Sequence, residues 1–216
     1  MTKELIFKKE ASTKNEVRTS NVKQNFLYVL GLCISLLFAI SCGSNVSKLS
    51  ADAEGFEKIQ KELISKFGAD AYYDLIYIGN SLPANRPGGG IWIQVNVTQK
   101  PESLKMEEWA YNSHSGWTQT SDITVEIPDD TDMKEFLFQL KGKFDLKKVG
   151  EMVESSSKKL ADEKNLKNSV MNSAVLNTLR SPISETRVFI DMTPENGGTK
   201  FGFRYDLDGN LEDFSY

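Results

Sequence analysis

An uncharged apolar run near the amino terminus constrains this chain most, because it decides which residues are left to fold. Phe26–Ile40 contains 15 residues without a charged side chain, and six basic residues precede it. A membrane-spanning helix needs about 20 apolar residues, since the hydrocarbon core is about 30 Å thick. A shorter run behind a basic segment is typical of a secretion signal. We therefore expect residues 1–41 to be a signal peptide with a long basic leader.

The residues after this run resemble the lipobox of bacterial lipoproteins. Small side chains precede a cysteine in Ala39–Gly43 (AISCG), although Ala39 stands where that family usually has leucine. The resemblance implies that the Cys42 thiol receives diacylglycerol, that cleavage makes Cys42 the first residue, and that a fatty acid such as palmitate acylates its amino group. It also implies a lipid-anchored protein of the bacterial cell envelope, at the outer membrane and facing the periplasm or the surface. The alternative is a single-pass membrane protein without lipid.

The 175 residues from Cys42 onward must fold without covalent support. Cys33 would leave with the signal, so no disulfide is expected. The first 41 residues hold six of the 26 basic and three of the 30 acidic side chains, so the remainder is near −7. That sign gives no reason to expect nucleic acid. One histidine and two cysteines exclude zinc sites built from several imidazoles or from four thiolates, and we expect neither metal nor cofactor.

Apolar periodicity and turn residues predict an α+β fold of antiparallel meander sheets with packed helices. Ser50 and Asp145 are the expected caps of the first and third helices. The expected helices cover 51–67, 133–140, 145–162 and 169–179. The expected strands cover 72–78, 91–98, 107–112, 117–127, 185–193, 200–206 and 211–216.

These elements divide the mature chain into a tether and two halves. Residues 42–50 form the tether, 51–128 the first α+β half and 129–216 the second. Each half begins with a helix and continues with consecutive antiparallel strands. Such an αβββ duplication loosely resembles the PepSY-like modules of exported bacterial proteins. The alternative is that unrelated antiparallel hairpins share the same pattern.

No catalytic or metal-binding constellation is visible. His114 lies between two serines in a tight turn, where adjacent residues rarely aim at each other, so we interpret it as an exposed polar turn residue. Asp206–Asn210 has its glycine at the wrong position for a calcium loop and is interpreted as a hairpin turn. The acidic residues at Asp129, Asp130 and Asp132 are interpreted as a helix start. An envelope hydrolase with carboxylates brought together by folding is the alternative.

Aromatic residues in the first half supply a candidate binding surface. Trp92 shares strand parity with Gln94 and Asn96, which predicts that it lies on the more polar side of the sheet. The candidate surface for an envelope protein or glycan comprises Trp92, Trp109, Tyr111, Trp117 and Arg86 of the 80–90 loop. The alternative is that these rings form a second layer of core, covered by the helices of the second half. The function expected is therefore a non-enzymatic binding, scaffolding or inhibitory module.

Overall fold

A computed structural model describes residues 46–81, 89–126, 132–142, 144–178 and 183–216. The expected signal peptide, the lipidation site Cys42 and the loop residue Arg86 lie outside these ranges, as do Asp129 and Asp130. Among the described residues, no helix is both long enough and apolar enough to span a membrane.

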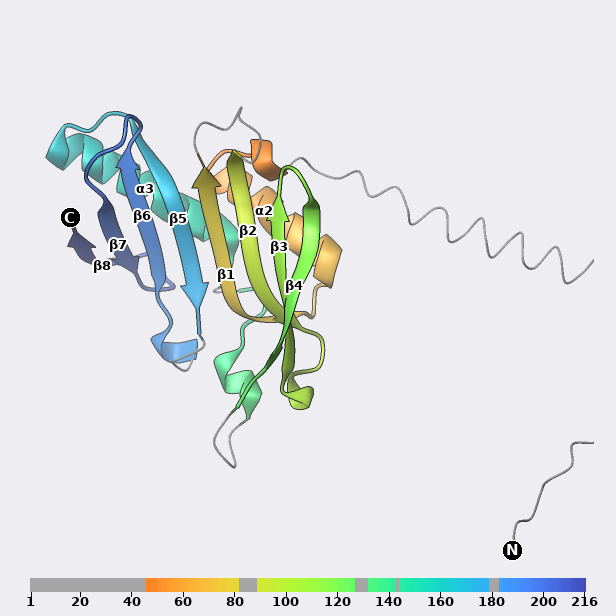
Figure 1. The fold of residues 1–216 in the computed structure, drawn as a ribbon. Helices are drawn as coiled ribbons and strands as arrows, with labels where there is room; N and C mark the ends of the chain where they lie inside the picture. Colours follow the sequence, from red (N-terminus) through yellow and green to blue (C-terminus); the bar gives the residue numbers. More distant parts are fainter. Residues whose placement is uncertain (1–45, 82–88, 127–131, 143, 179–182) are drawn as a thin grey trace, which may run out of the picture. The chain divides into compact units, whose positions relative to one another are not determined.

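Eight antiparallel strands form one continuous sheet, so the α+β class is confirmed and strands dominate it (Figure 1). Their order across the sheet is β4-β3-β2-β1-β5-β6-β7-β8. The strands are β1 (Tyr72–Ser81), β2 (Gly90–Thr98), β3 (Lys105–Asn112), β4 (Gly116–Thr124), β5 (Ser169–Asn177), β6 (Val188–Pro194), β7 (Phe201–Tyr205) and β8 (Leu211–Ser215). All seven expected strands are present, with small shifts at their ends. The eighth, β5, was expected to be a helix.

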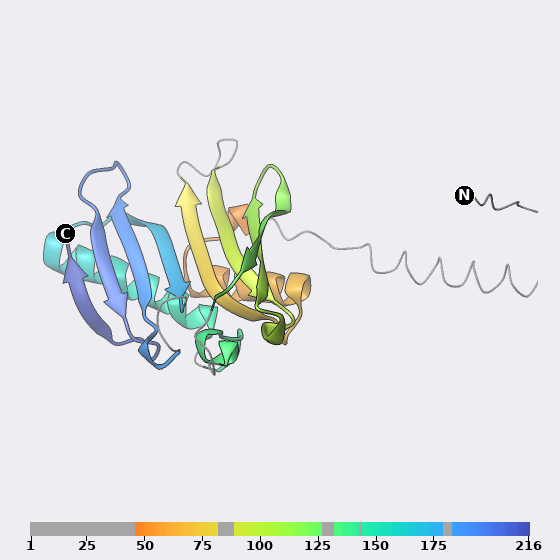
Figure 2. The same ribbon diagram turned by 60° about the horizontal axis from the view of Figure 1, so that its bottom comes forward.

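Two α-helices, α2 (Ala53–Phe67) and α3 (Leu146–Lys164), lie behind the sheet in both views and contact each other (Figures 1 and 2). Along the chain each helix precedes four strands. The expected helices 51–67 and 145–162 are thus confirmed, and the Asp145 side chain caps α3 by accepting a hydrogen bond from the Lys147 N–H at 2.9 Å. The cap of α2 is Asp52 and not Ser50, because the helix begins only at Ala53.

The prediction of a helix over 169–179 is wrong, because Ser169–Asn177 forms strand β5 between β1 and β6. A register shift between Met171 and Ser173 interrupts the strand's alternation. As a result Met171 and Ala174, three positions apart, share the buried face, and a helix would also place residues at that spacing on one side.

The helix expected over 133–140 is also wrong in extent. Only Met133–Phe136 is helical, as the short 3₁₀ turn η3. Phe138 then pairs with Tyr73 through two backbone hydrogen bonds of 2.8 Å. This bridge places the Phe138 side chain in the main core, whereas Met133 and Leu137 belong to a separate small apolar cluster.

The main core lies between the sheet and the two helices. Phe56, Ile59 and Leu63 of α2 are fully buried, as are Ile93 and Val95 of β2. The 3₁₀ turn η1 (Val46–Lys48) also contributes, since Val46 is 0% exposed and packs in this core. Part of the segment expected as a tether is therefore folded.

Candidate functional site

The sheet face opposite the helices, called the open face here, carries a central group of apolar side chains. Strand register places Tyr77 of β1, Trp92 of β2, Val175 of β5 and Phe189 of β6 on it. The Tyr77 and Trp92 rings stack with their centroids 4.8 Å apart. Phe189 is 49% exposed although both of its neighbours in the chain are buried. These four residues are called the central patch.

Trp92 lies directly over Gly79 on this face. A β-carbon at Gly79 would stand 2.1 Å from the indole, so only glycine leaves room for the ring. The two residues are also register partners in adjacent strands. Covering a glycine in this way stabilises a sheet, so Trp92 has a structural role as well as partial exposure.

Charged residues flank the central patch on both sides: Glu108 of β3 shares the open face with Asn96, and Asp191 and Arg204 lie beyond β5. Strands β1, β2 and β5, described over their whole length, place no charged side chain on the open face except the buried bulge residue Asp74. Beyond β5, Lys200 pairs with Asp191 at 2.7 Å, and this hydrogen bond raises the pKa of Lys200. Arg204 pairs with Glu212 at 3.4 Å. The open face thus has an uncharged centre and a charged margin.

The structure divides the expected binding surface into two groups. Trp92 lies on the open face, as its strand parity predicts. Trp109, Tyr111 and Trp117 lie on the other face, where the Trp109 and Trp117 rings contact Phe67 of α2 with centroids 5.7 and 5.3 Å away. Their indole N–H groups donate to Glu107 and Glu62. These three aromatic residues are partly buried and pack against the main core on the side of α2, not under the helices of the second half.

Tyr77, Val175 and Phe189 were missed by sequence reasoning. Strand alternation around Phe189 would have found that residue, because it stands between Val188 and Ile190 in a strand that was correctly expected. Strand alternation could not place Val175, because its segment, Ser169–Asn177, was predicted to be a helix.

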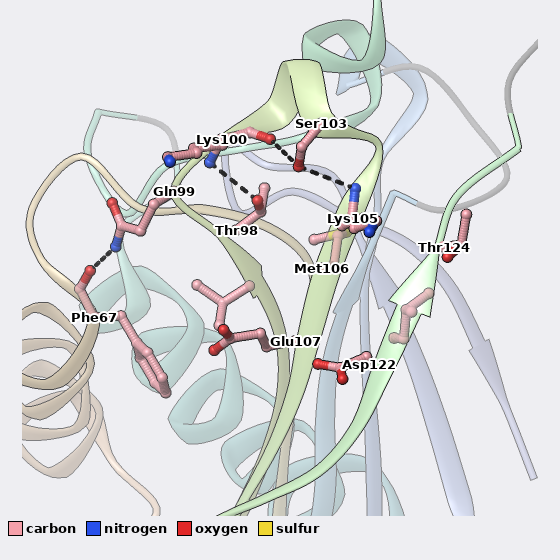
Figure 3. A pocket seen from close by; sticks show the side chains of 12 residues that line it. Phe67, Thr98, Gln99, Lys100, Ser103, Lys105, Met106, Glu107, Asp122 and Thr124 are labelled. Carbon is pink, nitrogen blue, oxygen red and sulfur yellow. Dashed lines mark hydrogen bonds between the residues drawn. The ribbon is translucent and has the colours of Figure 1, made fainter. Parts of the chain in front are cut away.

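A cavity of about 500 Å³ lies beside the last turn of α2 (Figure 3). Phe67, Val97 and Met106 provide its apolar lining. Its polar boundary is held by local hydrogen bonds: the Gln99 amide donates to the Phe67 carbonyl, and the Lys100 N–H donates to the Thr98 hydroxyl at 3.1 Å. Eight of its twelve lining residues are polar or charged, so the cavity suits a polar or charged group better than an apolar ligand.

Two carboxylates face the cavity from neighbouring strands. Glu107 of β3 and Asp122 of β4 are register partners, and like charges in that position destabilise a sheet. Each accepts a single hydrogen bond, from Trp109 Nε1 and Gln119 Nε2 respectively, both at 2.8 Å. Both side chains are exposed, whereas a general acid in a carboxylate pair is usually shielded from water. The arrangement therefore suits binding of a cationic group better than acid–base catalysis.

Asp74 is the most perturbed acid of the described residues. It occupies the bulge in β1, is 1% exposed, and neither carboxylate oxygen has a hydrogen-bond partner within the described ranges. Burial raises its pKa to about 6, and the neighbouring Asn96 amide opposes this shift only in part.

The remaining sequence candidates are turn residues. Asn112 accepts backbone hydrogen bonds from His114 and Ser115, and His114 is exposed. The Asp206 carboxylate accepts from the backbone of Asp208 and Asn210 and from the Asn210 side chain, which lowers the pKa of Asp206. Within the described ranges, no group of three or more His, Cys, Asp or Glu is placed to hold a metal ion.

No protein-family model, curated protein or solved structure matches this chain. Its function must therefore be inferred from the geometry of the open face and the cavity.

Proposed function

We propose that this protein is a lipid-anchored module of the bacterial cell envelope that binds another envelope protein through its open face. The observation that carries the proposal is the arrangement of that face, with an uncharged aromatic centre inside a charged margin. Protein interfaces have this anatomy, because charged groups are costly to desolvate at the centre and remain hydrated at the rim.

A protein partner is favoured over a glycan by the composition of the central patch. Phe189 and Val175 have no polar group to offer a sugar hydroxyl, yet they continue the row of register partners that runs from Tyr77 across β5 to β6. The ion pairs at the margin, Lys200–Asp191 and Arg204–Glu212, also leave little unbalanced charge there. The partner surface that fits is therefore apolar and uncharged at its centre.

Photocrosslinking in living cells tests this proposal. A photoreactive amino acid in place of Phe189 should form a discrete adduct, because that side chain projects from the central patch. The matched control is Leu211 of β8, a large apolar side chain that is 38% exposed. The crosslinked protein is then purified, and its affinity for the full chain is measured in detergent.

Phe189→Asp should weaken that affinity by at least about 30-fold, as expected for a central contact worth 2 kcal/mol or more. Leu211→Asp should leave it within about threefold. Equal affinity for both variants would contradict the proposal. Binding of purified envelope glycans that is lost in Trp92→Ala would instead assign the face to carbohydrate.

The proposed anchor is the lipid on Cys42. The fold begins only a few residues later, at the buried Val46, so a lipid on Cys42 would hold the body close to the membrane. Multiple acyl chains make such attachment stable, whereas one chain is marginal. Labelled palmitate should enter the wild-type chain and be absent from Cys42→Ala. Labelling of Cys42→Ala, or an unmodified intact amino terminus in the mass spectrum, would exclude lipidation at Cys42.

We also propose that the two halves arose by duplication. Each comprises one helix followed by a four-stranded meander, and the first strands of the two meanders, β1 and β5, are neighbours in the sheet. Two equivalent units joined through equivalent strands account for this order with one operation.

A further inference from the structure

Strand β4 is a nine-residue edge strand whose only charge, Asp122, lies beyond a bulge at Thr120. Trp117–Ser121 (WTQTS) carries no charge and no proline, and the described part of the chain supplies no hydrogen bond to the outer backbone of β4. The opposite edge is different, because β8 has only five residues and carries Glu212 and Asp213. Natural proteins usually shorten or charge such edges to prevent pairing with other chains.

The cavity borders this edge. A bulge at Thr120 divides β4, and Asp122 and Thr124 in its second part line the cavity. In Figure 3, Glu107 and Asp122 lie apart from Lys100 and Lys105, which stand at the other end of the cavity. A strand added to β4 would therefore place alternate side chains beside two carboxylates.

We propose that β4 binds an extended segment of a partner protein as an added ninth strand, and that the cavity takes a lysine or arginine of that segment. The cationic group would lie by Glu107 and Asp122, which β3 and β4 place nearest to the added strand. Backbone pairing supplies affinity in this mode of recognition and the pocket supplies specificity. This site is separate from the central patch, so the inference stands without the proposed function.

Electrostatic repulsion favours a segment of another protein over a second copy of this chain as the strand that pairs with β4. Two copies paired through β4 would bring four carboxylates to one junction, since each contributes Glu107 and Asp122. The mature chain is also acidic overall, near −7. A basic segment instead relieves the repulsion between the two register partners.

A synthetic peptide tests the inference. The probe is the fluorescein-labelled, amidated peptide TVKVTV, titrated against the full chain in detergent and followed by anisotropy. Glu107→Gln combined with Asp122→Asn should weaken binding by about 5- to 10-fold, because two partly exposed charge contacts are removed. Glu195→Gln, an exposed acid of the β6–β7 turn, is the matched control and should have no effect. Hydrogen exchange should show protection of β4 on peptide binding.

Two altered peptides separate the pocket from the strand. Replacing lysine by norleucine should weaken binding as much as the double variant does. N-methylation of alternate amides should abolish binding, because it removes the pairing groups. The proposal would be overturned if either altered peptide bound as tightly as TVKVTV, or if hydrogen-exchange protection were confined to β8. A dimer of the full chain that buries β4 would assign the edge to a second copy.

Discussion

At the scale of single residues, Asp74 links stability to pH. Its folded pKa of about 6 lies above the value of 3.8 that is usual for an aspartate, so the unfolded chain releases the proton first as pH rises. The free energy of unfolding is therefore highest below pH 3.8 and falls by about 3 kcal/mol as the pH rises from 3.8 to about 6. Asp74→Asn should raise the unfolding free energy at pH 7 and have less effect at pH 5, measured by urea unfolding. Asp162→Asn, an exposed acid on α3, is the control; equal pH dependence in all three proteins would contradict this reading.

At the scale of elements, the start of α2 shows how a cap selects a boundary. Asp52 accepts a hydrogen bond from the Gly55 N–H at 2.8 Å, and this bond together with Ser50 lowers the pKa of Asp52. Asp52→Ala should therefore lower the unfolding free energy by about 1 kcal/mol. Ser50→Ala is the matched comparison and should cost clearly less, because Ser50 acts only through Asp52. A larger loss in Ser50→Ala, measured by thermal or urea unfolding, would restore Ser50 as the cap.

At the scale of the whole molecule, contact between α2 and α3 links the helix that precedes β1–β4 to the helix that precedes β5–β8. A β-carbon at Gly150 of α3 would lie 2.5 Å from the Asp52 carbonyl oxygen and 2.6 Å from the Ala53 backbone. Gly150→Ala should therefore destabilise by about 1 to 3 kcal/mol, although alanine favours a helix over glycine by about 1 kcal/mol. The loss of unfolding free energy should be the same by two measurements: tryptophan fluorescence, which reports on β2, β3 and β4, and hydrogen exchange of β7. A Gly150→Ala variant that is more stable than wild type, or a loss of unfolding free energy seen by only one of the two measurements, would contradict this coupling. Ser155→Ala, at an exposed position of α3, is the control.

Local patterns in the sequence predicted the elements whose signals are unbroken. The alternation of Ile91–Thr98 gave strand β2 and the face of Trp92, and Asp145 correctly marked the start of α3. Segments with an interrupted pattern were misread. The bulge in β5 imitates a helix, and η3 ends early because Phe138 pairs with Tyr73, 65 positions away along the chain.

The sequence by itself determined the α+β class and the expectation of a lipid at Cys42, because each depends on residues that are neighbours in the chain. Only the tertiary structure decided that Trp109 and Trp117 pack against Phe67 and Tyr111 against Trp117. It also decided that Trp92 joins Tyr77, Val175 and Phe189 on the open face. The physical reason is that alternation assigns a residue to one of two faces, whereas the packing of α2 and α3 determines which of those faces is covered.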